Sequence, residues 1–214
     1  MTKCVIFDCD GTLVDSEVLF NRALSIKLSE RGVELTADQL VSRFRGVKLT
    51  DVLNTLEAQY KVTLDKEFVD DYRVLVNAFF EKELVACSGV KETLSVLGLP
   101  MCVATNGPLG KMQLALRVTD LIDFFDGQLF SAYEVGAWKP DPELFLFAAQ
   151  TLGFNADECL VVEDSIVGIE AAKAANMMAV LYDPHHVHPD IDGAIKIHAF
   201  EDLLKQLRAM QLSQ

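Results

Sequence analysis

The sequence predicts an α/β fold in which a doubly wound, Rossmann-like parallel sheet carries an inserted α-helical cap. One observation is a set of short apolar runs that are continuous rather than alternating, which is typical of strands buried on both faces of a parallel sheet. Another is the helical pattern of the segments between these runs. A third is a long block after the first run, residues 16–87, without a convincing strand. A sheet domain interrupted by a helical insertion satisfies all three.

The predicted strands each end in polar residues or in Gly and Pro. Four runs are clear and a fifth is weaker. The clear runs cover residues 3–7, 101–104, 159–162 and 178–182, and the weaker run covers 128–131. In sheets of this kind ligands collect beyond the carboxyl ends of the strands. The side chains that follow each run are therefore the first candidates for a functional site.

The inserted block is predicted to be a helical bundle. A helix over residues 17–31 stops at a glycine, and Thr36 with Gln39 is a candidate capping box for the next helix. Thr50 and Asp65 are candidate caps of a third and a fourth helix. We expect this bundle to lie over the strand ends as a lid. The expected domains are a discontinuous core of residues 1–15 and 88–214 and a cap of residues 16–87.

Composition and charge exclude several classes of protein. Half of the 214 residues are hydrophobic, enough for a full core, and no stretch approaches the roughly 18 apolar residues that span a bilayer. Nineteen basic residues against 32 acidic ones give a net charge of −13, which would repel a nucleic-acid backbone. Five dispersed cysteines suit reduced thiols better than a disulfide framework. We expect a cytoplasmic monomer that acts on a small molecule, with no nucleic-acid or membrane partner.

Reactive side chains follow the predicted strands at their carboxyl ends. Each alone is explained as a turn or helix cap, but their joint placement on one edge argues against that. Four carboxylates crowded together are costly at pH 7 without a cation, and oxygen donors without His or Cys favour Mg²⁺. We therefore expect a Mg²⁺ site. Its expected ligands are Asp8, Asp10, Glu163 and Asp164, and the other reactive residues at this edge are Thr105, Asn106 and Lys139.

Phosphoryl transfer is the chemistry that suits these residues. An ionised Asp is a nucleophile without any base, so Asp8 can form an aspartyl-phosphate. Asp10, two residues further on, is placed to protonate the leaving oxygen and then to deprotonate the attacking water. Thr105, Asn106 and Lys139 would bind the phosphate and offset its repulsion from Asp8. The expected catalytic residues are Asp8, Asp10, Thr105 and Lys139.

A basic cluster in the predicted cap is a second candidate for substrate contact. Arg43, Arg45 and Lys48 surround Gly46 in a loop between helices. An Arg side chain is well shaped to bind a carboxylate, such as that of a sugar acid. Arg45 and Lys48 are therefore candidate substrate-binding residues, and a solvated basic turn is the alternative interpretation that stays open.

Four segments resemble the motifs of the haloacid dehalogenase superfamily, in the family's order and across the whole chain. The segments are Asp8-Cys9-Asp10-Gly11-Thr12, Val103-Ala104-Thr105-Asn106-Gly107, Lys139-Pro140-Asp141-Pro142 and Val161-Val162-Glu163-Asp164-Ser165. A helical insertion between the first two motifs is similar to the family's C1 cap. The resemblance implies Asp8 as nucleophile and metal ligand, and Asp10 as acid and base with its backbone oxygen on Mg²⁺. It also implies that Thr105 and Lys139 contact phosphate and that Glu163 and Asp164 contact the metal.

Within the superfamily the chain is most similar to β-phosphoglucomutase-like and 6-phosphogluconate phosphatase-like members. The similarity lies in residues 44–48, 106–108, 111–113 and 138–142. Dehalogenating members lack the second Asp of the first motif, and Phe20 stands where the mutases carry a cap histidine. The resemblance implies a Mg²⁺-dependent phosphatase of small phosphorylated sugars or sugar acids, with 6-phosphogluconate as a candidate substrate. A sugar-phosphate mutase and, less favoured, a phosphoacceptor signalling domain are the alternatives.

Overall fold

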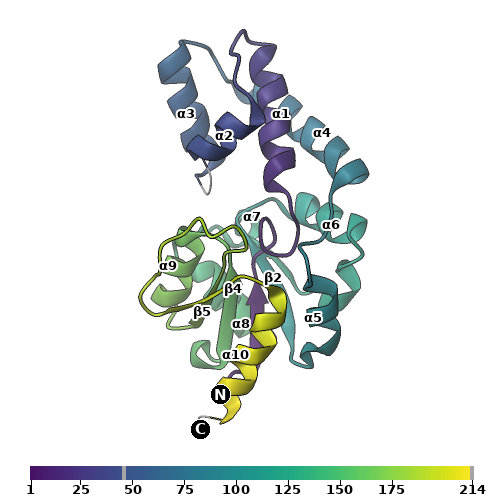
Figure 1. Ribbon diagram of the computed structural model, residues 1–214, viewed down its shortest axis with the longest axis vertical. Coiled ribbons are helices and arrows are strands. Elements are labelled where there is room, and N and C mark those ends of the chain that lie inside the picture. The colour runs from purple at the N-terminus through teal and green to yellow at the C-terminus, as the bar shows by residue number, and fades with distance from the viewer. Residues whose placement is uncertain (45–46, 213–214) are drawn as a thin grey trace. The chain divides into compact units, whose positions relative to one another are not determined.

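The computed structural model describes residues 1–44 and 47–212 and divides into two compact units (Figure 1). One unit consists of Met1–Val14 and Val85–Gln214, and the other of Asp15–Leu84. The helical insertion thus begins at residue 15 and ends at residue 84, where the sequence indicated residues 16 and 87. Each unit is described by itself.

The larger unit is built on a six-stranded sheet with the strand order β3-β2-β1-β4-β5-β6, in which all neighbouring strands are parallel. The strands are β1 (Cys4–Phe7), β2 (Met101–Thr105), β3 (Leu129–Ser131), β4 (Cys159–Glu163), β5 (Met178–Tyr182) and β6 (Ala194–Ile197). Its helices are α5 (Val90–Leu97), α6 (Leu109–Val118), α7 (Ala132–Val135), α8 (Glu143–Leu152), α9 (Ile166–Ala174) and α10 (Phe200–Leu212), with 3-10 turns η1 (Ile122–Phe125) and η2 (Ala156–Glu158). The predicted α/β fold is confirmed.

The apolar runs of the sequence form strands with bounds close to those predicted. Among the described residues, β6 is the one strand that the sequence did not predict. Every residue of β1 and β4 is buried, as a strand covered on both faces requires. In β6 only Ile197 is buried, and Lys196 interrupts the apolar run. An edge strand of this kind has no continuous hydrophobic signal to detect.

Helices cover both faces of the sheet, and two neighbouring side chains of β1 show how. Ile6 lies in a buried cluster with Ala148 of α8 and Ile169 of α9. Phe7 points to the other face, where its ring stacks on Phe200 of α10 at 6.4 Å and meets Phe125 edge-on at 6.3 Å, both between ring centroids. Figure 1 shows α10, in yellow, lying across that face. The strand β1 is therefore packed on both faces, which fixes the position of the residues that follow it.

The described residues of the smaller unit form four helices, and side-chain caps set the starts of the second and the fourth. The helices are α1 (Glu17–Ser29), α2 (Ala37–Phe44), α3 (Leu49–Tyr60) and α4 (Lys66–Glu83). The capping box predicted before α2 is present: the Gln39 amide donates to Thr36 Oγ1 at 3.2 Å, and the Thr36 amide donates to Gln39 Oε1 at 2.9 Å. Asp65 caps α4 by accepting a hydrogen bond from the Phe68 amide at 3.0 Å. The prediction for Thr50 is wrong, because α3 begins at Leu49, and Lys48, two residues before Thr50, holds the N-cap position.

Polar and apolar contacts join α1 to α4 within this unit. The Arg22 guanidinium lies 3.9 Å from the centre of the Phe79 ring and donates to Glu83 at 2.8 Å. Phe20 packs on Phe80 with ring centroids 5.4 Å apart. These contacts come from neighbouring turns of both helices, so they fix the register of one helix against the other.

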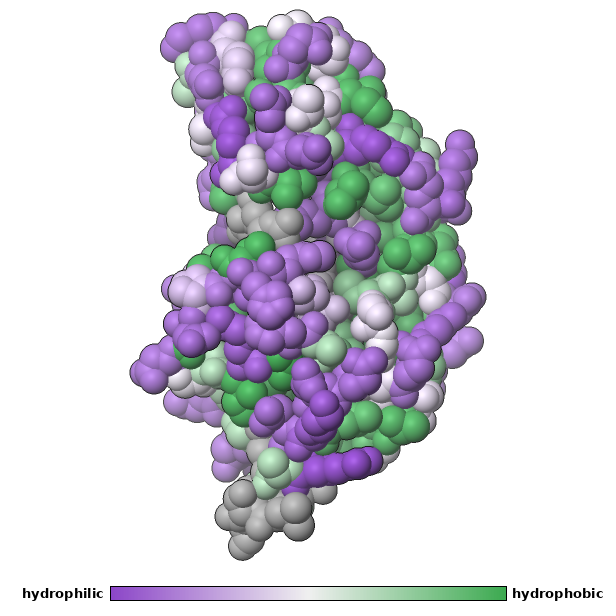
Figure 2. All heavy atoms as spheres, viewed as in Figure 1, coloured by the Kyte–Doolittle hydropathy of each residue, from purple (hydrophilic) through white to green (hydrophobic). Residues whose placement is uncertain are grey.

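The surface is predominantly hydrophilic on the face shown in Figure 2. This agrees with the acidic composition, in which charged residues make up 24% of the chain. None of the helices that the structure describes is long and apolar enough to pass through a lipid bilayer.

Replacing Asp65 with Ala tests the cap of α4. Loss of the hydrogen bond to the Phe68 amide should lower the free energy of unfolding by about 1 kcal/mol, measured by urea denaturation. Asp70→Ala is the matched control, since Asp70 forms an exposed pair with Lys66 one turn away and should cost no more than about 0.5 kcal/mol. Equal costs for the two variants would contradict the capping role.

Candidate active site

A buried lysine connects the carboxyl ends of two strands. Asp8 directly follows β1 and Glu163 ends β4, and the Lys139 ammonium lies between them, 2.5 Å from Asp8 Oδ1 and 2.6 Å from Glu163 Oε1. The Lys139 side chain is 2% exposed. A buried ammonium is costly unless it is paired, and here two carboxylates pair with it. The three residues therefore form one charged unit that holds β1, β4 and the Lys139 loop together.

Asn106 fixes the loop that carries Lys139. Its side-chain oxygen accepts the Lys139 amide at 2.9 Å, and its side-chain nitrogen donates to the Lys139 carbonyl at 3.3 Å. Asn106 was expected to contact substrate, and in the structure its amide group contacts the Lys139 backbone. Thr105, 2% exposed, accepts the Gly107 amide at 3.1 Å, and Ser131 Oγ donates to the Gly107 carbonyl at 2.7 Å.

The start of α9 holds Glu163 in place. Glu163 Oε2 accepts hydrogen bonds from the Ser165 amide at 3.0 Å and from the Ser165 hydroxyl at 2.7 Å. That hydroxyl also caps the helix by accepting the Gly168 amide at 3.1 Å. A Cβ on Gly168 would lie 1.9 Å from Glu163 Cδ, so only glycine leaves room for the carboxylate. Both oxygens of Glu163 are thus held by donors from the protein.

Three carboxylates gather where a metal ion would fit. Oxygens of Asp8, Glu163 and Asp164 lie within 4.8 Å of one another. Asp164 lies against Gly11, whose φ of +79° and lack of a side chain permit the approach, since a Cβ there would be 2.0 Å from Asp164 Oδ2. Hard oxygen donors of this kind fit Mg²⁺. The carboxylate of Asp10 pairs with Lys111, and the expected contact of Asp10 with the metal is through its backbone oxygen.

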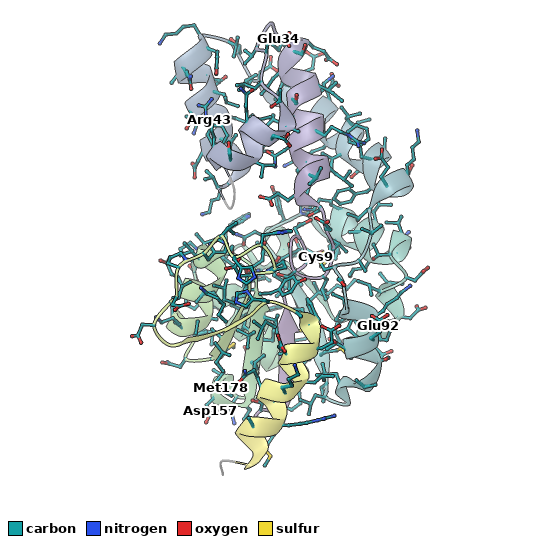
Figure 3. The ribbon with its side chains drawn as sticks, viewed as in Figure 1. Cys9, Glu34, Arg43, Glu92, Asp157 and Met178 are labelled. Carbon is teal, nitrogen blue, oxygen red and sulfur yellow. The ribbon has the colours of Figure 1, made fainter. Side chains whose placement is uncertain are left out.

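The turn after β1 is compact and orients Asp10. The Leu13 amide donates to the Cys9 carbonyl at 2.9 Å, and the Gly11 amide donates to the Val14 carbonyl at 2.9 Å. Figure 3 labels Cys9, which lies between the two aspartates at this end of β1 and is itself fully buried. The turn therefore presents Asp8 and Asp10 while Cys9 packs inward.

Burial and like charges shift the ionisation of the carboxylates. Burial raises the pKa of Asp8 to about 7, with further contributions from Glu163 and Asp10, although Lys139 opposes the shift. Burial, followed by the charges of Glu163 and Asp8, raises the pKa of Asp164 well above its usual value. Burial alone would lower the pKa of Lys139, but the charges of its two carboxylate partners raise it above its usual value. A divalent cation would therefore favour the ionised cluster.

Sequence reasoning did not assign a role to Lys111, which contacts Asp10. The Lys111 ammonium forms an ion pair with Asp10 Oδ2, and the two side chains are 19% and 22% exposed. Burial alone would lower the pKa of Lys111, but Asp10 raises it above its usual value. One signal was available: a lysine in the first turn of a helix is disfavoured by the helix dipole, and such local conflicts often mark functional residues.

Of the basic cluster predicted in the helical unit, the structure describes Arg43 and Lys48. Arg45 and Gly46 lie outside the described residues. Lys48 is exposed at the N-cap of α3. Arg43, labelled in Figure 3, donates to Gln59 at 2.6 Å. Arg43 therefore has a structural partner within its own unit.

Without metal the protein should become less stable as pH rises, and Mg²⁺ should counteract this loss of stability. Because the pKa of Asp8 is raised to about 7 and that of Asp164 is also raised, the native chain keeps protons that the unfolded chain loses above about pH 4. Without metal, the free energy of unfolding should therefore fall, by at least about 1 kcal/mol, as pH rises from about 5 to about 7.5. Denaturation in EDTA and in Mg²⁺ measures this, and Mg²⁺ should stabilise more at the higher pH.

Asp164→Asn is the control for this prediction. It removes one carboxylate of the cluster, so it should flatten the pH dependence in EDTA and weaken the effect of Mg²⁺. Stabilisation by Mg²⁺ of equal size at both pH values in the unaltered protein would contradict the assignment.

Comparison with known proteins identifies the family. The model of the family "haloacid dehalogenase-like hydrolase" matches residues 2–176. The chain is 37% identical over 209 residues to 6-phosphogluconate phosphatase of Escherichia coli K12, covering 95% of each protein. It is 29% identical to hexitol phosphatase B of the same strain, covering 87% of the chain and 89% of that protein. A crystal structure of a HAD family hydrolase from Deinococcus radiodurans R1, with bound phosphate and sodium, superposes with a TM-score of 0.79 at 31% identity, covering 99% of this chain and 97% of that one. The chain therefore belongs to the haloacid dehalogenase-like hydrolase family.

Proposed function

We propose that this hydrolase is a Mg²⁺-dependent phosphatase that cleaves monoesters of small phosphorylated sugars or sugar acids through an aspartyl-phosphate on Asp8. The observation that carries the proposal is the placement of Asp8 beside the Lys139 ammonium and the Asp164 carboxylate at the end of β1. The two relatives named above are a sugar-acid phosphatase and a hexitol phosphatase, which favours substrates of this class.

The groups that would hold Mg²⁺ are the carboxylates of Asp8, Asp164 and Glu163 and the backbone oxygen of Asp10. When bound, the ion supplies positive charge that offsets the repulsion between Asp8 and a phosphate and polarises the phosphoryl group. Glu163 has a second task in this arrangement, because its hydrogen bonds to Lys139 and Ser165 hold the lysine in position.

The first half of the reaction transfers the phosphoryl group to the protein. An Asp8 carboxylate oxygen attacks phosphorus, the bond from phosphorus to the ester oxygen breaks, and Asp10 gives its proton to the departing alkoxide. The Lys139 ammonium and the Thr105 hydroxyl are the proposed donors to the phosphoryl oxygens, where negative charge is concentrated in the transition state. Asn106 contributes by holding the Lys139 backbone.

The second half returns Asp8 to its starting state. Asp10, now a carboxylate, takes a proton from water as the water oxygen attacks phosphorus and the bond from Asp8 to phosphorus breaks. The products are inorganic phosphate, the Asp8 carboxylate and a protonated Asp10. Because one residue gives a proton and then accepts one, a full cycle leaves the protein unchanged.

Phe20 favours hydrolysis over the alternative of a sugar-phosphate mutase. The ring lies on α1 and packs on Phe80 of α4, so an apolar contact occupies the position of the mutases' cap histidine. The proposed role of Asp10 also favours a phosphatase over a phosphoacceptor signalling domain. Asp10 would activate water to hydrolyse the aspartyl-phosphate, whereas a signalling domain retains it.

The proposed substrate contacts in the helical unit are Arg45 and Lys48, on their charge alone. The proposed location is the cytosol, since no disulfide forms among the described residues, which include all five cysteines. A net charge of −13 supports a small metabolite rather than a nucleic acid as the partner.

A panel of about a hundred phosphate esters with Mg²⁺ tests the function. We expect one sugar or sugar-acid phosphate to be preferred, and Asp8→Asn should lower kcat by at least about 10⁴-fold for every ester. Arg45→Ala and Lys48→Ala should raise KM for the preferred ester and spare 4-nitrophenyl phosphate, whereas Lys66→Ala, an exposed control in α4, should change neither. Unchanged turnover by Asp8→Asn would refute the proposal.

Gly168→Ala tests the support of Lys139 by Glu163. The added methyl must displace the Glu163 carboxylate, so kcat should fall by about 10²-fold, the effect of misplacing a catalytic group by about 1 Å. Gly110→Ala is the matched control, because this helical glycine has nothing within 4 Å of the added Cβ and the change should preserve kcat. A fall of the same size in the control, or none in Gly168→Ala, would contradict the supporting role.

A further inference from the structure

A second lysine stands beside the acid and base of the site. Lys111 belongs to the first turn of α6, and its ammonium pairs with Asp10 Oδ2 across 101 residues of sequence. The first lysine, Lys139, pairs with Asp8 and Glu163. The two catalytic aspartates therefore each have an ammonium partner, one lysine from helix α6 and the other from the loop before α8.

The space for Lys111 is made by Gly107. A Cβ on this glycine would lie 2.9 Å from Lys111 Nζ and 3.5 Å from Thr105 Oγ1. Lys111 and the phosphate-binding candidate Thr105 thus flank the same backbone atom. Lys111 therefore lies close to Thr105 while its ammonium pairs with Asp10.

The charges of the site support a role for Lys111. Four carboxylates and two ammonium groups, all ionised, leave two negative charges, which one divalent cation would neutralise. This count applies while Asp10 is a carboxylate, the form that takes a proton from water in the second half of the reaction. Without Lys111 the cluster would then keep one negative charge with the metal bound. The residues counted are Asp8, Asp10, Glu163, Asp164, Lys111 and Lys139.

An ordinary surface ion pair in the same unit gives a comparison. Lys91 and Asp120 lie 3.0 Å apart with side chains 45% and 82% exposed, and such pairs contribute little. The Lys111 and Asp10 side chains are 19% and 22% exposed, so water screens their interaction less. The Asp10 carboxylate is therefore held more firmly in one orientation.

We propose that Lys111 is a positioning residue that holds the Asp10 carboxylate toward the leaving-group oxygen of the substrate. The inference rests on the proposed function, in which Asp10 transfers the proton. It assigns to α6 a task in catalysis, whereas the motifs of the sequence assigned α6 none. The two lysines therefore have different proposed roles. Lys111 acts on the departing alcohol through Asp10, whereas Lys139 binds the phosphoryl oxygens.

The experiment compares two esters that differ in their need for a proton. A primary alkyl phosphate, 6-phosphogluconate, loses a strongly basic alkoxide and needs the acid, whereas 4-nitrophenyl phosphate loses a weakly basic phenolate. Lys111→Met should lower kcat for the alkyl ester by about 10²-fold and for the aryl ester by less than about tenfold. Lys111→Arg should recover part of the loss, because it restores a cation that can contact Asp10.

Several controls make the result specific. Lys91→Met removes the exposed pair and should leave kcat for both esters unchanged. Adding Lys111→Met to Asp10→Asn should cause little further loss for the alkyl ester, because the group that Lys111 positions is already gone. Circular dichroism and urea denaturation verify folding, and Lys111→Gln replaces Lys111→Met if the latter does not fold.

Three outcomes would overturn the inference. They are equal loss of kcat for both esters, a higher KM for both with kcat unchanged, and no loss for either. The second would make Lys111 a phosphate-binding cation. Failure of the proposed function shows separately, as turnover that survives Asp8→Asn, whereas failure of the Lys111 role shows in a protein that still requires Asp8.

Discussion

The burial of the Lys139 ammonium between two carboxylates is the constraint on which the rest of the site depends. The lysine cannot leave its partners without exposing unpaired charge in a dry interior, and Asp8 and Glu163 cannot both stay ionised there without it. Asn106, Ser165 and Gly168 support this arrangement. Each either holds one member of the charged unit or leaves room for it.

Much of the fold followed from the sequence because its signals are local. The strands β1, β2, β4 and β5 are short apolar runs buried on both faces, and such runs are visible without knowing their neighbours. The cap at Asp65 and the capping box at Thr36 are equally local. The prediction for Thr50 was wrong because threonine can occupy either the N-cap or the first turn of a helix. Only the observed start of α3 shows that Thr50 lies in the first turn.

The sequence indicated which residues lie together at this edge of the sheet, but not which groups each side chain contacts. Parallel strands bring Asp8 and Glu163 to one edge by topology alone, so composition at the strand ends was enough to group them. Which group each side chain contacts depends on loop conformation, and that is how Asn106 came to hold the Lys139 backbone. Lys111 was missed because its partner Asp10 is distant in sequence and no pattern joins the two.

The position of β1 in the sheet affects how the chain folds. The strand β1, which Asp8 follows, is synthesised before its partners β2 and β4, which are residues 101–105 and 159–163, beyond the whole helical insertion. Contacts of such long sequence separation form late and slowly. An emerging chain therefore exposes Asp8 long before Lys139 and Glu163 are made. Under the proposed function, the site is therefore complete only after β2 and β4 have paired with β1, and a partly made chain would lack the groups that bind the phosphate and the metal.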